Sequence, residues 1–328
     1  MFLSSLNQMA TLALFVLIGF ALAKLKIVGK EASTTLSRFE NNLFLPALVL
    51  YTFIENFNLT TLSQSWKLLL FSLGAEIIVI PVAIFSAKLC SKDGFIRRMY
   101  TYGLSFSNFG FMGNAVFMAL RPDLYQQYII FTLPLWTLIY IWGVPGLLIE
   151  KEDGNEQATK KQKILSSLKS LANPMFIALI IGAIIGITGL GEILLSLNQP
   201  KGLFFIEVIK ICGNCMSPIA MIMTGITFAF INFKKVFSTA SIYVVTILRL
   251  VVYPLVFGGI ALLISKFICH IPDYIFICFI CSLSMPLGLN TIVIPSAYGK
   301  DTSIPAGMAL ASHLLSVITI PLIFTILL

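Results

Sequence analysis

Two apolar stretches of the chain combine helix-weakening glycine or proline with carboxamide side chains. The residues are Asn108, Gly110, Gly113 and Asn114 in the first stretch and Pro286, Gly288 and Asn290 in the second. A helix that breaks inside a membrane frees backbone N–H and C=O groups, and the half-helix that follows carries partial positive charge at its N-terminus. Two such breaks at equivalent places indicate a binding site for a transported solute. The alternative is that the glycines only let helices pack closely.

Two opposite charges, Glu76 and Arg249, also lie within apolar segments, each five residues before a proline. An unpaired charge at the bilayer centre costs roughly 2.5–3.5 kcal/mol, so we expect the two to offset each other. Two interpretations stay open. The pair is structural, or it is functional, with Arg249 attracting a substrate anion and Glu76 binding a coupling proton.

His313 is a second candidate for coupling, because an unperturbed imidazole changes its charge near physiological pH. A lone histidine on an apolar helix is more often a hydrogen-bonded packing residue, and that interpretation is favoured. The chain has no nucleotide-binding or hydrolase motif, so we expect neither an enzyme nor a bound cofactor. Both C-x-x-C pairs, Cys212/Cys215 and Cys278/Cys281, fall in or near apolar segments. We expect these cysteines to be packing residues there, and we expect no metal site.

These residues must be positioned by membrane-spanning helices, since 58% of the chain is hydrophobic and only 11% is charged. Crossing a hydrocarbon core of about 30 Å takes roughly 20 apolar residues. The fold class predicted is an all-α polytopic membrane protein with ten transmembrane helices. The expected spans are 6–24, 36–54, 66–89, 99–120, 125–149, 173–191, 203–231, 236–265, 272–298 and 303–328.

Charge predicts the orientation of the spans. The loops on one side hold 16 of the 22 basic residues, and such loops face the cytoplasm. We therefore expect both termini outside the cytoplasmic membrane. The formal charge of +8 then reflects topology, and no nucleic-acid partner is expected.

The chain divides into two matching halves. Residues 1–149 and 173–328 are the expected repeats, and a charged cytoplasmic loop, 150–172, separates them. The matched positions are Pro46 with Pro218, Pro81 with Pro254, Asn114 with Asn290, and Pro145 with Pro321. Since each half has an odd number of helices, the two repeats are predicted to be inverted, with helices 4 and 9 broken.

Several short motifs, in order and spacing, resemble the auxin efflux carrier family. They are 107–114, 171–174, 248–254, Met285-Pro286 with 297–299, and 312–316. The family includes plant PIN-FORMED auxin exporters and bacterial malate and malonate permeases, and it is related to bile acid/sodium symporters. The resemblance implies a scaffold of helices 1, 2, 6 and 7, a transport domain of helices 3–5 and 8–10, and a substrate site where helices 4 and 9 cross. Plant members have a proline on each broken helix, whereas the fourth span here has Gly110 and Gly113.

The function expected is secondary active transport of a small organic anion, such as malate or malonate, by alternating access. The coupling ion is expected to be H+ or Na+, and the resemblance makes a homodimer within the lipid bilayer plausible. A membrane receptor that binds a small ligand without moving it is the alternative. An intramembrane enzyme is a third and weaker possibility.

Overall fold

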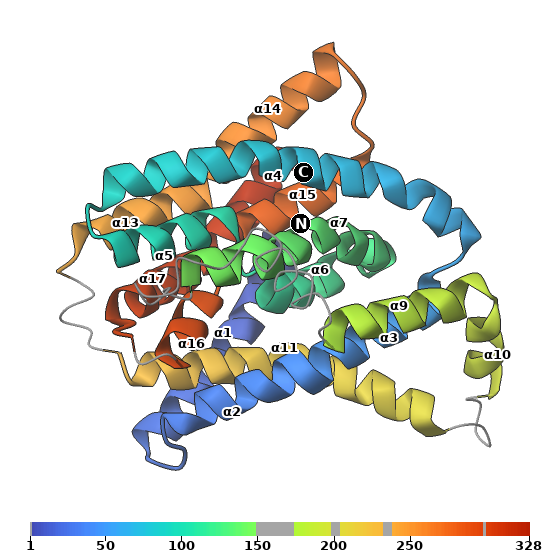
Figure 1. Ribbon diagram of the computed structural model, residues 1–328, viewed down its shortest axis with the longest axis horizontal. Helices are drawn as coiled ribbons and strands as arrows, with labels where there is room; N and C mark the ends of the chain where they lie inside the picture. The colour runs from blue at the N-terminus through green and yellow to red at the C-terminus, as the bar shows by residue number, and fades with distance from the viewer. Residues whose placement is uncertain (1, 149–173, 198–203, 232–237, 298–299) are drawn as a thin grey trace, which may run out of the picture.

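The computed structural model describes residues 2–148, 174–197, 204–231, 238–297 and 300–328. The predicted cytoplasmic loop, 150–172, lies outside the described residues. The described chain is helical throughout, apart from loops and one isolated β-bridge. Figure 1 shows the helices in two groups, with α2, α3, α9, α10 and α11 toward the bottom of the view and α4, α5, α7, α13 and α15 toward the top.

The first half of the chain begins with one long helix and then a helix that contains a π turn. The π turn, η1, directly precedes Pro46, a residue that lacks an N–H and crowds the carbonyl four residues before it. A capping box between Asn58 and Thr61 starts the next helix. The bounds are α1 Phe2–Lys24, α2 Glu31–Phe39, η1 Glu40–Phe44, α3 Leu45–Asn56 and α4 Leu59–Cys90.

The fourth predicted span is interrupted, as the sequence indicates. Helix α5 ends at Ser105, and helical structure resumes as a π turn at Phe109. The fifth span is unbroken but also ends in a π-helical stretch, which contains Pro145. The bounds are α5 Gly94–Ser105, η2 Phe109–Gly113, α6 Asn114–Leu120, η3 Pro122–Leu124, α7 Tyr125–Leu138 and η4 Ile139–Leu148.

The second half contains the second interruption. Helix α15 ends at Ser284, and Met285, which precedes Pro286, is extended, as a residue before proline prefers to be. The π turn η5 lies just before Pro254. The bounds are α9 Pro174–Ile187, α10 Leu190–Leu197, α11 Phe204–Ala229, α13 Ala240–Ile247, η5 Leu248–Val252, α14 Tyr253–Phe267, α15 Asp273–Ser284, α16 Asn290–Ala297 and α17 Ser303–Leu327.

Six described helices are long and apolar enough to cross a membrane, and a bent pair makes a seventh. The breaks leave Phe109–Met118 and Asp273–Ser284 as shorter apolar helices, so length and composition alone do not give the ten spans predicted. The sixth predicted span, 173–191, is bent. Helix α9 ends at Ile187, and α10 departs at 91°, after a turn with Gly189 at φ +75.

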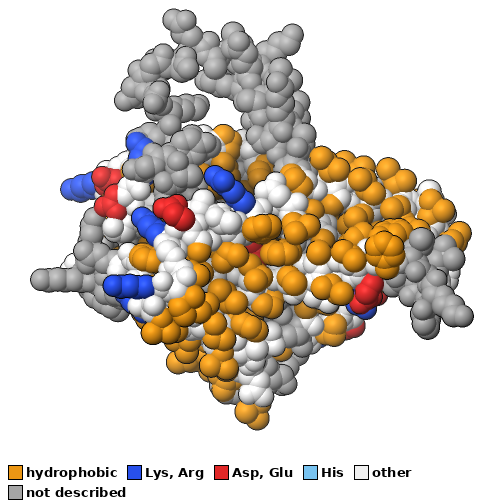
Figure 2. All heavy atoms as spheres, turned by 90° about the horizontal axis from the view of Figure 1, so that it is seen from below, with side chains coloured by type: hydrophobic (Ala, Val, Ile, Leu, Met, Phe, Trp, Pro, Cys, Tyr) orange, Lys and Arg blue, Asp and Glu red, His pale blue; other side chains and the backbone are white. Residues whose placement is uncertain are grey.

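Hydrophobic side chains cover much of the outer surface. Figure 2 shows them over a broad area of one face, with most of the coloured charged side chains gathered toward one end. Exposed leucines, isoleucines and phenylalanines lie on α1, α4, α9 and α14. A soluble protein does not expose contiguous apolar surface of this extent. The surface is compatible with contact to the lipid chains of a membrane.

Glycines bring two pairs of helices into close contact. A Cβ on Gly186 would meet the backbone of Phe57, and a Cβ on Gly182 would lie 2.8 Å from the Phe53 Cβ, so α9 packs tightly on α3. The Gly182-x-x-x-Gly186 sequence therefore acts as a close-packing motif between these helices. Gly225 on α11 likewise packs against the backbone of α1 at Val16.

Candidate functional site

The two helix breaks cross each other. Ser107 and Leu287 form an isolated antiparallel bridge, and the Asn108 N–H donates to the Pro286 carbonyl at 2.7 Å. Backbone groups that a break exposes must find partners when no water is present. Here each break supplies partners for the other, which explains why the two interruptions occur together in the sequence.

Side chains reinforce this crossing. The Ser107 hydroxyl donates to the Ser282 carbonyl at 2.7 Å. The Leu287 N–H donates to the Ser312 hydroxyl on α17 at 3.2 Å. The crossing is therefore fixed to α15 and to α17 as well as to itself.

Arg249 binds the carbonyl ends of both interrupted helices. From the π turn η5, its guanidinium donates to the Leu104 carbonyl at 2.8 Å and to the Ser282 and Met285 carbonyls at 3.3 Å each. The side chain is 2% exposed. Because the C-terminus of a helix carries partial negative charge, a cation at this position stabilises two helix ends at once.

Glu76 on α4 lies near Arg249, but within the described chain it forms no salt bridge. The two side chains line one small cavity between α4, α5, α7, η5 and α15. Glu76 Oε2 has no hydrogen-bond partner among the described residues. The structure thus brings the predicted pair together without a direct bond between them.

His313 is bonded through both ring nitrogens. Nδ1 lies 2.8 Å from the Ala309 carbonyl, which only accepts, so we assign the hydrogen to this nitrogen. Nε2 then accepts from Asn108 Nδ2 at 3.0 Å. This arrangement is the one expected of a packing histidine, and it also links α17 to the first break.

The carboxamides of Asn114 and Asn290 are both held by neighbours. Asn114 Nδ2 donates to the Gly110 carbonyl. Asn290 Nδ2 donates to the Tyr102 hydroxyl at 2.9 Å. Each carboxamide therefore has a defined orientation, with its oxygen left to accept from another group.

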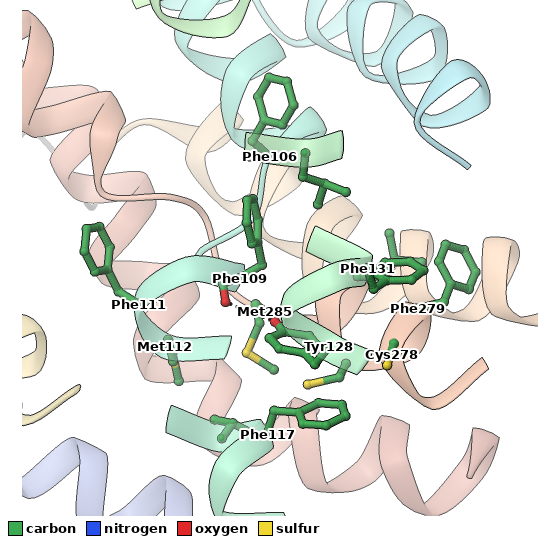
Figure 3. Close-up of a cluster of buried hydrophobic side chains, with 14 of the residues drawn as sticks. Phe106, Phe109, Phe111, Met112, Phe117, Tyr128, Phe131, Cys278, Phe279 and Met285 are labelled. Carbon is green, nitrogen blue, oxygen red and sulfur yellow. Dashed lines mark hydrogen bonds between the residues drawn. The ribbon is translucent and has the colours of Figure 1, made fainter. Parts of the chain in front are cut away.

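The glycines of the first break are packing positions. A Cβ on Gly110 would run into the Trp136 ring, and one on Gly113 would run into the Tyr128 hydroxyl. Figure 3 shows Tyr128 beside this segment, with its hydroxyl pointing to the Phe109 carbonyl, to which it donates at 3.0 Å. In the second break, a Cβ on Gly288 would lie 3.3 Å from the Phe106 carbonyl. The alternative of close packing therefore describes Gly110 and Gly113 well.

A cavity of about 360 Å³ lies between α1, α11 and the first broken helix. Its wall mixes apolar side chains with neutral polar ones, and no charged side chain lines it. The lining residues are Gln8, Thr11, Leu12, Phe15, Leu48, Asn114, Ala115, Met118, Tyr125, Gly213, Asn214, Ser217 and Pro218. This volume accommodates a small organic molecule.

The predicted site residues fall around different cavities. Asn114 lines the large cavity. Arg249 shares the small cavity with Glu76. Gly113 and Pro286 line none of these cavities. The remaining predicted residues, which line a third cavity of about 20 Å³ at the crossing, are Asn108, Gly110, Gly288 and Asn290.

Sequence reasoning missed the opposite wall of the large cavity. Gln8 and Thr11 lie three residues apart on α1, and Asn214 and Ser217 lie three apart on α11. Residues at this spacing share one helix face, and polar residues in membrane helices usually face the protein interior. That spacing, beside Pro218, is the signal that would have found them.

The comparison with protein families decides the identity of the chain. Residues 4–324 match the profile of a family described as "membrane transport protein". The chain belongs to this family, the auxin efflux carrier family. As a member of the auxin efflux carrier family it is a multi-pass membrane transporter and not an enzyme, which confirms the resemblance noted in the sequence. No curated protein matched the chain.

Proposed function

We propose that this membrane transporter carries a small organic anion, with dicarboxylates such as malate and malonate the first candidates, by secondary active transport. The observation that carries the proposal is the large cavity, because it reaches Asn114 on the helical segment that follows the first break. The carboxamides of Gln8, Asn114 and Asn214 and the hydroxyls of Thr11 and Ser217 supply neutral hydrogen-bond donors to an anion in this cavity. An anion is thus stabilised without a permanent cation in the cavity wall.

Alternating access follows if one group of helices moves against the other. We propose the scaffold of spans 1, 2, 6 and 7 and the transport domain of spans 3–5 and 8–10. The extensive packing of α1 on α11 and of α3 on α9 supports this division, because these contacts join the first span to the seventh and the second to the sixth. The cavity lies where the two groups meet, so that sliding would expose it to one side and then to the other.

An inverted repeat is the simplest origin of this arrangement. It is supported by the two breaks, which both divide a span into two short helices and both precede an asparagine. We propose ten spans, with both termini outside and the basic loops in the cytoplasm. The homodimer stays an expectation from the family.

Coupling to H+ or Na+ is part of the proposal, and Glu76 and His313 stay the candidate residues. Arg249 lies outside the large cavity, and its three carbonyl bonds suit it to holding the breaks in place. In this account its charge acts on the substrate through the potential at the crossing, and direct contact is not required.

A panel of labelled carboxylates tests the substrate class. The full chain in proteoliposomes should take up a dicarboxylate in a saturable way, and the same compound should raise its thermal stability in detergent. Stabilisation without uptake would favour a receptor, and chemical conversion would favour an enzyme. Stabilisation by cations or neutral solutes alone would overturn the anion proposal.

A further inference from the structure

Three buried oxygens with no described hydrogen-bond partner converge on the small cavity beside Arg249. They are Glu76 Oε2 and the hydroxyls of Ser72 and Ser105. Ser72 is 0% exposed, Ser105 2% and Glu76 7%. A buried polar atom without a partner costs about 1–3 kcal/mol, so three around one cavity point to a shared ligand.

The cavity has the size of a single small ligand. Its volume is about 10 Å³, and a water molecule needs a site of about 10–15 Å³. The oxygens come from α4 and α5, while Arg249 on η5 and Ser282 on α15 complete the wall. Phe131 and Leu135 of α7 also line the cavity, so a ligand there is enclosed by five elements. It is separated from the large cavity, whose lining residues are different.

The lining combines donors with acceptors, which identifies the ligand. Arg249 has five N–H groups, and the described carbonyls accept from its Nε, Nη1 and Nη2 atoms, so N–H groups remain for a further partner. A water molecule accepts from a guanidinium and donates to a carboxylate. A metal cation accepts nothing from it, and the charge of Arg249 would repel it.

We propose that this cavity binds one water molecule, which bridges the Glu76 carboxylate to the Arg249 guanidinium and gives partners to the two serine hydroxyls. The water completes a buried ion pair whose members do not touch. Through this water the Glu76 carboxylate offsets the charge of Arg249, while the Arg249 side chain binds the ends of α5 and α15. This inference concerns the support of the crossing and does not depend on which solute is carried.

Thermal unfolding of the purified full chain tests the water. In an empty cavity, Ser72→Ala and Ser105→Ala would each remove an unsatisfied group and raise Tm or leave it unchanged. With a bridging water, each substitution removes one of its partners and lowers Tm by a few degrees. Ser65→Ala is the matched control, because Ser65 lies seven residues before Ser72 on α4, is also buried, and donates to the Thr61 carbonyl.

The proposal expects a lower Tm for both cavity variants, little change for Ser65→Ala, and the same values when choline replaces sodium in the buffer. A raised or unchanged Tm for both cavity variants would show that the cavity is dry. Sodium-dependent stabilisation of the wild type that is lost in Ser72→Ala would show a cation site. Either result overturns the proposal.

Discussion

Arg249 donates hydrogen bonds to the carbonyl ends of both interrupted helices. Lysine at this position keeps the charge, but its one ammonium does not match the planar fork of a guanidinium that reaches three carbonyls. The side chain is enclosed, so its hydrogen bonds are not replaced by water. Its role is therefore set by geometry as much as by charge.

We predict that Arg249→Lys lowers the free energy of unfolding by about 1.5–3 kcal/mol, the range for hydrogen bonds that involve a charged group. Arg121→Lys is the control, because Arg121 pairs with Asp123 at an exposed position, where salt bridges contribute about 0–1 kcal/mol. Denaturant titration in detergent measures both variants. Equal losses in the two would refute the role assigned to Arg249.

Asn214 belongs to the wall of the large cavity that faces the broken helix. We predict that Asn214→Ala raises the KM for the transported solute by up to about tenfold, the effect of one lost hydrogen bond, and leaves Tm unchanged. Asn42→Ala is the control, because Asn42 is exposed and donates to the Arg38 carbonyl of its own helix. An unchanged KM for Asn214→Ala would mean that this wall does not contact the solute.

At the scale of elements, the position of the breaks was predictable and their support was not. Pro286 lies in the second break itself, whereas the first break, 106–108, comes just before Gly110 and Gly113, which lie in the π turn η2. The sequence therefore indicated both interruptions, the first to within a few residues. The partner of each break lies about 180 residues away, at Leu287 for Ser107, and no local pattern encodes such a distant contact. The bend after Ile187 was not predicted, because Thr188 and Gly189 lie within one continuous apolar stretch, and such a stretch is typical of a single helix.

The close contact of η2 with α7 gives a test of element packing. We predict that Gly113→Ala destabilises the protein, because the added methyl would meet the Tyr128 hydroxyl. Tyr128→Phe should restore part of the loss when combined with it, since phenylalanine lacks that oxygen. Measuring Tm for the wild type, the two single variants and the double variant completes a double-mutant cycle.

Gly74→Ala is the matched control for this cycle, since nothing lies within 4 Å of a Cβ added there. It should leave Tm unchanged or raise it, because alanine favours the helix. Strictly additive effects of Gly113→Ala and Tyr128→Phe would contradict the proposed contact.

At the scale of the whole molecule, composition and charge predicted the class of protein well. The apolar content requires membrane helices, and six described helices, or seven with the bent pair, are long and apolar enough to cross a membrane. The number of ten spans stays a prediction. The residues that line the large cavity were harder to predict, because the lining depends on how α1 and α11 pack. Gln8 and Asn214 lie 206 positions apart in the sequence, and only folding brings both to the wall of one cavity.

The orientation of the chain in the membrane is a separate prediction. Epitope tags at both termini should be reached by antibodies on intact cells, whereas a tag inserted between Ser91 and Lys92 should be reached only after permeabilisation. The basic loops are expected to stay in the cytoplasm. Terminal tags that are hidden in intact cells would contradict the topology proposed.

The central claim is that the large cavity, which Asn114 lines, binds an organic anion that the protein carries across the membrane. Uptake of labelled malate or malonate into proteoliposomes, compared between the wild type, Asn114→Ala and Asn42→Ala at matched protein incorporation, tests it most directly. We predict saturable uptake by the wild type and by Asn42→Ala, and uptake reduced about tenfold or more in Asn114→Ala. Equal uptake by all three folded proteins, or no uptake of any carboxylate by the wild type, would contradict the claim.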